Sequence, residues 1–294
     1  MRTWLVTGAS KGLGAAIART ALAHGERVAL TSRGISSADT IFAEFPDSAL
    51  PVTLDVVDAQ SISAAVRKVE EWAGPIDVLV NNAGQGIHGA IEETSDRNLR
   101  ALFDVNFFGV AATIREVLPS MRARGSGFII NIGSVAGFVA NPETGAYCAT
   151  KFALEALTEA LRKEVAGMGV KVSIVVPGGM RTGFNGSSIW QADARMEAYQ
   201  ATAGARTRDL SRNATHRGSD VRAAAAAIWS LANEADPPSH LILGADAIER
   251  IDQKLSLLRS HLARANPLTE DFNDNSSGAA VSGATDFGAG DERT

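Results

Sequence analysis

Cysteine is scarce in this sequence of 294 residues. Cys148 is the one cysteine, so an internal disulfide cannot form. The start of the chain, from Met1 to Val6, enters a strand-like pattern without the charged and apolar regions of a signal peptide. Long apolar runs are also absent, and none approaches the roughly 20 residues that a membrane-spanning helix needs. We therefore expect a cytoplasmic protein without membrane insertion.

The sequence also lacks an excess of charge of either sign. Its net charge is −5, with acidic and basic residues interspersed, which predicts no nucleic-acid partner. The five histidines are scattered and do not show the short spacing with Cys, Asp or Glu that a zinc site needs. We expect no metal, and the remaining class of partner is a small molecule.

Apolar residues make up 45% of the chain, enough for one substantial core. The first 180 residues alternate short apolar runs with amphipathic stretches, which is typical of repeated βα units. This pattern predicts an α/β fold: a single-domain, Rossmann-type, doubly wound parallel sheet of about seven strands with helices on both faces. The predicted strands are residues 3–7, 27–32, 50–55, 77–81, 127–132, 170–176 and 240–243. The predicted helices are residues 12–24, 61–72, 95–122, 146–166 and 219–232.

The composition also suggests how the chain is divided. We expect the α/β domain to cover residues 1–245 and to include a lid at about 182–217, where the alternation breaks down. Apolar residues at helical spacing then predict a C-terminal helical extension over 246–265. Residues 266–294 are rich in Gly, Ser, Asp, Asn and Thr, a composition that predicts a mobile tail.

A glycine-rich turn follows the first predicted strand and opens the first predicted helix. Backbone N–H groups and the helix dipole would converge there on a pyrophosphate. The glycines are not spaced as in G-x-G-x-x-G, and a merely flexible turn is the alternative. The predicted cofactor-binding residues of this turn are Gly8, Ser10, Lys11, Gly12, Leu13 and Gly14.

The end of the second predicted strand indicates which dinucleotide binds. A carboxylate there would bind a 2′-hydroxyl, but the sequence has Ser32 and Arg33, with Lys11 in the neighbouring turn. These groups suit a 2′-phosphate, so we expect NADP(H) to be preferred over NAD(H). Either basic residue alone would more commonly be a solvated surface charge.

Two further strand ends complete the expected cofactor site. Asp55, followed by Val56, is placed to accept a hydrogen bond from an adenine amino group, although a helix-capping role is an alternative. Asn82, Ala83 and Gly84 follow the fourth predicted strand, where small residues would let a ribose lie against the backbone. The alternative for these three residues is a simple tight turn. Both segments fall at carboxyl ends of strands, where open α/β sheets bind ligands.

Tyr147 and Lys151 stand four residues apart at the start of a long predicted helix, so they share one face. A neighbouring ammonium favours the phenolate, and we expect it to lower the tyrosine pKa from about 10. Ser134 ends the fifth predicted strand and would reach the same edge of the sheet, where its hydroxyl can hold a carbonyl oxygen. The three residues together are a stronger indication than Tyr-x-x-x-Lys alone.

With these motifs the chain resembles the short-chain dehydrogenase/reductase family over roughly residues 3–245, in particular its hydroxysteroid-dehydrogenase-like branch. The resemblance implies a catalytic tetrad of Asn106, Ser134, Tyr147 and Lys151, in which Asn106 holds a water and Tyr147 and Lys151 also contact the cofactor. It further implies that Pro177, Gly178 and Met180 lie by the nicotinamide and that Thr182 binds its carboxamide. Gly133 departs from the family, many members of which carry a serine there.

The expected activity is an NADP(H)-dependent interconversion of a ketone and a secondary alcohol, with Tyr147 as general acid and base. The alternatives are a non-catalytic NADP-sensing regulatory protein and, less favoured, a lyase or dehalogenase on the same scaffold. We expect a small hydrophobic substrate and, from the family's dimer-interface helices, a homo-oligomer (dimer or tetramer). The predicted substrate-binding residues are Gln85, Ser134, Val135, Tyr147 and Phe184. Further candidates for the pocket are Ile87, His88, Phe138, Met180, Trp190 and Tyr199.

Overall fold

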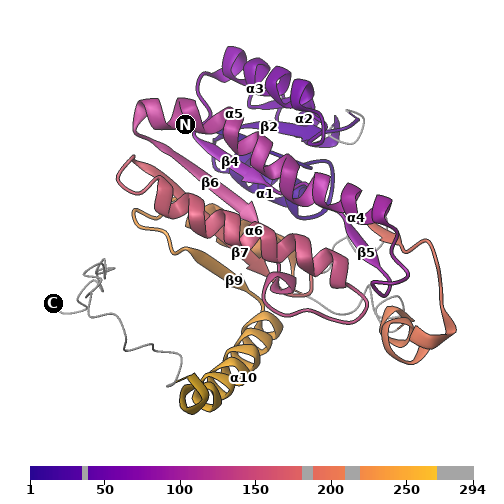
Figure 1. Cartoon of the computed structure of the whole chain (residues 1–294). Coiled ribbons are helices and arrows are strands. Elements are labelled where there is room, and N and C mark those ends of the chain that lie inside the picture. The colour runs from indigo at the N-terminus through magenta and orange to yellow at the C-terminus, as the bar shows by residue number, and fades with distance from the viewer. Residues whose placement is uncertain (35–38, 181–187, 209–218, 270–294) are drawn as a thin grey trace. The chain divides into compact units, whose positions relative to one another are not determined.

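A seven-stranded parallel sheet forms the centre of the protein, which confirms the predicted fold class (Figure 1). The computed structural model describes residues 1–34, 39–180, 188–208 and 219–269. The spatial order is β3-β2-β1-β4-β6-β7-β9, and every neighbouring pair is parallel. The strands are β1 (Thr3–Val6), β2 (Arg27–Ser32), β3 (Ala49–Thr53), β4 (Val78–Asn81), β6 (Gly127–Ile132), β7 (Val170–Pro177) and β9 (His240–Leu243).

The chain winds outward from β1 in one direction and then from β4 in the other, so the strand order reverses between these two neighbours. Ligands of open α/β sheets bind outside the carboxyl ends of the strands at such a point. The fold therefore places the turns that follow β1 and β4 at the centre of a potential binding crevice.

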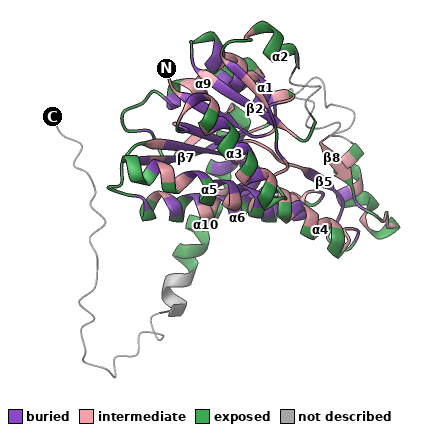
Figure 2. Cartoon of the chain, turned by 90° about the horizontal axis from the view of Figure 1, so that it is seen from above, coloured by how far each residue is buried: buried purple, intermediate pink, exposed green. Residues whose placement is uncertain are grey.

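Helices cover both faces of the sheet because successive strand side chains point to opposite sides. In β1, Trp4 and Val6 join the core cluster under α1 (Gly12–Ala23) and α9 (Val221–Leu231). Leu5 joins the cluster on the other face, to which α3 (Ala59–Ala73), α5 (Gly109–Arg124) and α6 (Gly145–Glu164) contribute. Figure 2 shows the strands as a buried layer between helices with exposed outer surfaces.

The helix ends follow ordinary capping chemistry. Ser95 caps α4 (Asp96–Phe103) by accepting a hydrogen bond from Asn98 N. Aspartates cap the starts of two other helices: Asp58 caps α3 and Asp220 caps α9. The single helix predicted over 95–122 is α4, a π-helical turn η2 (Asp104–Phe108) and α5 in succession.

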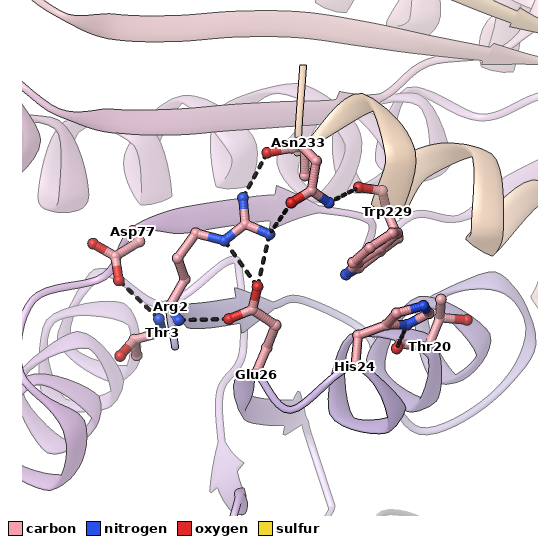
Figure 3. Close-up of polar contacts among 9 residues, drawn as sticks. Arg2, Thr3, Thr20, His24, Glu26, Asp77, Trp229 and Asn233 are labelled. Carbon is pink, nitrogen blue, oxygen red and sulfur yellow. Dashed lines mark hydrogen bonds and ion pairs between the residues drawn. The ribbon is translucent and has the colours of Figure 1, made fainter. Parts of the chain in front are cut away.

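The start of β1 is fastened to the end of α9 by Arg2 (Figure 3). Its guanidinium donates to Glu26 Oε1 at 2.7 Å, to Ala232 O at 2.6 Å and to Asn233 Oδ1 at 3.1 Å. Glu26 is buried, so this ion pair is partly shielded from solvent. Segments more than 200 residues apart in the sequence are thereby held together.

A second, two-stranded sheet was not predicted. It pairs β5 (Gly86–His88) with β8 (Ile189–Gln191), and β8 belongs to the predicted lid. The described part of the lid also contains the short helices η4 (Glu197–Tyr199) and η5 (Gln200–Gly204). Thr182 and Phe184 lie outside the described residues. A short helix α2 (Asp39–Glu44) was not predicted either.

The C-terminal helical extension is present as α10 (Ala245–Thr269), which continues past the predicted end at 265. Residues 1–254 form one compact unit, and the chain from Leu255 onward forms a second unit. In the ranges that the structure describes, no helix combines the length and the apolarity that crossing a membrane requires.

Candidate active site

A cavity of about 650 Å³ opens at the carboxyl ends of the central strands. Most residues predicted from the sequence to form the site line it. They are Gly8, Ser10, Lys11, Gly12, Leu13, Ser32, Arg33, Asp55, Val56, Asn82, Ala83, Gly84, Gln85, Ser134, Val135, Tyr147, Lys151, Pro177, Gly178 and Met180. Gly14 and Asn106 are not part of the lining, and their contacts are described below.

The glycine turn at the start of α1 has the features of an anion-binding site. Lys11 is the N-cap residue, its side chain makes no capping hydrogen bond, and the first turn of α1 has no acidic residue. Gly8 and Gly12 have φ values of 67° and 59°, which side chains rarely adopt. A Cβ at Gly14 would come within 2.5 Å of Gly8 O, so a glycine is needed there for packing. The turn fits a dinucleotide pyrophosphate.

The turn after β1 and the turn after β4 are tied to each other. Thr7 Oγ1 accepts hydrogen bonds from the backbone N–H groups of Asn82 and Ala83, both at 2.9 Å. Asn82 Nδ2 in return donates to Thr7 O at 2.8 Å and to Gly8 O at 3.1 Å. The expected pyrophosphate and ribose positions are thus held in fixed relation.

Ser32, Arg33 and Lys11 all line the cavity. Asp55 also lines it, and its Oδ1 accepts a hydrogen bond from Val57 N at 3.2 Å. Because Asp58 caps α3, Asp55 does not have the helix-capping role that was its alternative.

Tyr147, Lys151 and Ser134 lie together at the centre of the cavity. A hydrogen bond joins the side chains of Tyr147 and Ser134. Lys151 Nζ lies 5.8 Å from the centre of the Tyr147 ring and donates to Ile132 O at 2.8 Å. The start of α6 and the end of β6 bring these three groups together, the juxtaposition predicted from their spacing.

Burial dominates the ionisation of this group. It raises the pKa of Tyr147 to about 12, against the opposing effect of the hydrogen bond with Ser134. It lowers the pKa of Lys151 to about 8. The prediction that the pKa of Tyr147 is lowered beside Lys151 is therefore wrong. Moving the phenolate out of water costs more free energy than the neighbouring groups recover by stabilising it.

Asn106 reaches the site from the π-helical turn η2, a form that is frequent at functional sites. It is buried, and its side-chain amide forms hydrogen bonds with the backbone of Gln85 and with Thr150 Oγ1. A Cβ at Gly84 would lie 3.5 Å from Asn106 Oδ1 and 4.0 Å from Lys151 Nζ. The expected cofactor-binding turn, Asn106 and Lys151 are thus adjacent.

The turn after β7 is held by a residue that the sequence did not indicate. Asp246, in the first turn of α10, accepts a hydrogen bond from Gly179 N at 2.8 Å. A Cβ at Gly178 would come within 2.2 Å of Asp246 Oδ1, so the glycine permits this approach.

Packing also explains why Gly133 departs from the family pattern. A Cβ at this position would lie 2.8 Å from Ile174 Cδ1.

The cavity is more polar than predicted. Ile87, His88 and Trp190 line it as expected, whereas Phe138 and Tyr199 do not. Polar residues that were not predicted also line it, among them Asn141, Glu143, Thr144, Arg206 and Arg250. They come from the loop before α6, from the lid and from α10, and no local motif marks them.

His88 lines the cavity and is largely buried. Burial lowers its pKa, and the charge of Arg195 lowers it further. His88 is therefore neutral at physiological pH, which suits a residue at the edge of the pocket. Nowhere in the described ranges do three or more His, Cys, Asp or Glu side chains gather as a metal site would require.

Comparison with known proteins identifies the family. The family model described as short chain dehydrogenase matches residues 2–192. The chain belongs to this family. It is 35% identical over 249 residues to the oxidoreductase BOA17 of Botryotinia fuckeliana, a match that covers 84% of this chain and 90% of the relative. The protein is accordingly an oxidoreductase of the short-chain dehydrogenase type.

Solved structures agree with this assignment. A short-chain dehydrogenase from Streptomyces avermitilis shares 40% identity and superposes with a TM-score of 0.87, covering 93% of this chain and all of that one. An alcohol dehydrogenase from Thermococcus sibiricus, solved with 5-hydroxy-NADP, shares 27% identity with a TM-score of 0.69 and covers 83% of this chain and 96% of its own. The second of these structures contains a nicotinamide-type cofactor, which supports a nicotinamide cofactor for this fold.

Proposed function

We propose that this short-chain dehydrogenase interconverts a ketone and a secondary alcohol with NADP(H), and that Tyr147 is the general acid and base. The observation that carries the proposal is the contact of Tyr147 with Ser134 and its proximity to Lys151 in a cavity that also contains an anion-binding helix start. The cavity therefore contains a proton donor, a hydroxyl that can bind the carbonyl oxygen, and the expected cofactor site.

In the reductive direction, Ser134 donates a hydrogen bond to the carbonyl oxygen and orients it toward Tyr147. Bound NADPH supplies the hydride that adds to the carbonyl carbon. Tyr147 gives its phenolic proton to the oxygen as the alcohol forms. A pKa of about 12 keeps this phenol protonated at neutral pH, as a donor requires. Lys151, whose pKa is about 8, is mostly an ammonium at pH 7 and stabilises the phenolate until solvent returns the proton.

Asn106 has a positioning role in this proposal. The family resemblance assigns it a water beside Lys151, and this role stays a prediction. Its side-chain amide binds Gln85 and Thr150. We propose that Asn106 fixes Gln85 at the substrate end of the cavity. The roles of Thr182 in binding the nicotinamide carboxamide and of Phe184 in binding the substrate stay predictions.

The preference for NADP(H) rests on charge. Ser32, Arg33 and Lys11 line the cavity, and β2 ends without the carboxylate that would bind a 2′-hydroxyl and repel a 2′-phosphate.

A non-catalytic NADP sensor is less well supported. A binding module has no use for a tyrosine that is hydrogen-bonded to a serine and lies near a buried lysine, and all three residues line the cavity. The hydroxysteroid-dehydrogenase-like branch, a hydrophobic substrate, a cytoplasmic location and a homo-oligomeric state remain predictions from the sequence.

The test is a panel of ketones and secondary alcohols assayed with NADPH, NADH and their oxidised forms side by side. We expect carbonyl reduction with a kcat/KM for NADPH at least tenfold above that for NADH. A preference for NADH would contradict the roles of Lys11 and Arg33. Cofactor binding without turnover of any substrate would favour the sensor.

A further inference from the structure

One face of α10 carries large apolar side chains that are exposed to solvent. Ile248, Leu255, Leu258 and Leu262 are between 43% and 65% exposed. They follow one another at intervals of seven, three and four residues, which is the a and d spacing of a coiled-coil heptad. Ile251 fills the remaining d position and packs in the core. Beyond Ile251 this apolar stripe continues to Leu262 as exposed leucines.

An exposed stripe of this kind indicates a site of contact. Single apolar side chains are common on protein surfaces, but a contiguous exposed row marks an interaction site. Covering such a row removes apolar surface from water, which favours association. A narrow seam at heptad spacing fits another helix with the same spacing, because the side chains of one helix insert between those of the other. The stripe therefore indicates a helical partner.

The charges beside the stripe indicate that the partner is a second copy of α10. Asp252 and Arg259 occupy e positions, next to the apolar seam. Two antiparallel helices bring the a positions of one opposite the d positions of the other. With Leu255 opposite Leu258 of the second copy, Asp252 lies beside Arg259 of that copy at each end of the pair. The helix is thus complementary to itself, and opposite charges at flanking positions set partner choice and orientation.

Other arrangements of two α10 helices bring like charges together. Sliding the antiparallel pair by one heptad places either Asp252 beside Asp252 or Arg259 beside Arg259. A parallel pair places Lys254, at a g position, beside Arg259 at the following e position. In the favoured register Lys254 lies beside His261, and a histidine is mostly uncharged at about pH 8. The other charged residues of α10 occupy the outer b, c and f positions: Asp246, Glu249, Arg250 and Arg264.

We infer that two copies of this chain associate through their α10 helices, which pair antiparallel around Leu255 and Leu258. An ion pair between Asp252 and Arg259 flanks the seam at each end. Such a contact is isologous, since the same residues serve on both copies. The inference goes beyond the proposed function, and it places a contact of the expected homo-oligomer outside the family's dimer-interface helices.

Two neighbouring leucines provide a matched test by sedimentation velocity over a series of protein concentrations. Leu258 lies in the seam, whereas Leu257, which is 50% exposed, occupies an outer c position. We expect the wild type to self-associate and Leu258→Asp to weaken this step at least tenfold. Leu257→Asp adds the same charge one residue away and should sediment like the wild type. A monomeric wild type, or equal effects of the two substitutions, would overturn the inference.

Charge reversal tests the register. At low ionic strength and about pH 8, Asp252→Arg and Arg259→Asp should each weaken self-association, because each substitution places like charges beside one another. Mixing the two variants should restore association, since every contact between e positions then joins an arginine to an aspartate. A parallel pair predicts the opposite for Arg259→Asp, which would strengthen association through Lys254. Strengthening by Arg259→Asp, or no recovery on mixing, would overturn the inference.

Two other occupants of the stripe would give distinct results. If residues 270–294 of the same chain cover it, Leu258→Asp leaves self-association unchanged. If a membrane covers it, the wild type but not Leu258→Asp cosediments with vesicles of phosphatidylcholine and phosphatidylglycerol in equal parts, and self-association is again unchanged. Either result would overturn the inference. These measurements use no substrate and no cofactor, so their outcome is independent of the proposed activity.

Discussion

The side-chain amide of Asn106 forms a pair of hydrogen bonds with the backbone of Gln85. Gln85 N donates to Asn106 Oδ1 at 2.8 Å, and Asn106 Nδ2 donates to Gln85 O at 2.8 Å. The residue also donates to Thr150 Oγ1 at 3.0 Å, which connects the segment after β4 to α6. The π-helical turn thus holds the segment after β4 through a side chain that does not itself line the cavity.

Asn106→Asp should weaken this contact. The carboxylate still accepts from Gln85 N, but it faces Gln85 O without a donor, and a buried acceptor is left unsatisfied at a cost of about 1–3 kcal/mol. We expect this loss in urea unfolding, together with a fall in kcat/KM of at least tenfold because Gln85 shifts. Unchanged stability and kinetics would show that the two hydrogen bonds do not position the site.

Arg33→Ala should weaken NADPH selectively. A charge-assisted hydrogen bond to phosphate contributes about 1.5–3 kcal/mol, so KM for NADPH should rise about tenfold or more while KM for NADH stays within twofold. Arg100→Ala is a matched control, since Arg100 forms an exposed pair with Asp96 at 3.4 Å within α4. Equal effects of Arg33→Ala on both cofactors would remove this residue from 2′-phosphate recognition.

Lys151 should make the stability of the protein depend on pH. Its pKa falls from 10.5 to about 8 on burial, so between these values the unfolded chain binds more protons than the folded protein. Stability then rises with pH over this window, by up to about 1.4 kcal/mol per pH unit. Urea unfolding should show this rise in the wild type between pH 8 and 10, below the pH at which ionisation of Tyr147 contributes to the pH dependence of stability. The Lys151→Met variant should lack this rise. If stability changes with pH equally in the wild type and in the variant, burial does not lower the pKa of Lys151.

Arg2→Ala should destabilise the protein without touching the cavity. The substitution leaves Glu26 buried without its guanidinium partner and frees Ala232 O, at a cost of about 2 kcal/mol or a Tm lower by several degrees. Arg222→Ala is the control, because this arginine is 90% exposed beside Asp220 and its removal should change stability by less than about 0.5 kcal/mol. Equal Tm values for the two variants would show that the Arg2 contacts contribute nothing.

The seven strands could be predicted because each is a short apolar run set between helical patterns. The runs at Gly127–Ile132 and His240–Leu243 have the predicted bounds. Tyr147, Lys151 and Ser134 could be predicted to meet because one helix turn and one strand end determine their positions. Fold and catalytic cluster thus depend on local signals of a few residues.

Contacts between distant loops could not be predicted in this way. The strands β5 and β8 have three residues each and about a hundred residues between them, so neither shows a periodic pattern. Glu143 meets Arg206 across 63 residues, and Asp246 meets Gly179 across 67. The direction of the Tyr147 pKa shift was missed for a related reason, since the degree of burial depends on the whole packed cavity.

The most direct test of the account is single-turnover carbonyl reduction by Tyr147→Phe, on a ketone that the wild type reduces with NADPH. Tyr199→Phe is the matched control, because Tyr199 is the other tyrosine, donates to the exposed Glu92 and does not line the cavity. We expect Tyr147→Phe to lower the rate by 10²–10⁴-fold, about what a positioned general acid contributes, with NADPH affinity kept and Tyr199→Phe unaffected. A Tyr147→Phe rate equal to the wild-type rate would contradict the assignment of Tyr147 as the proton donor.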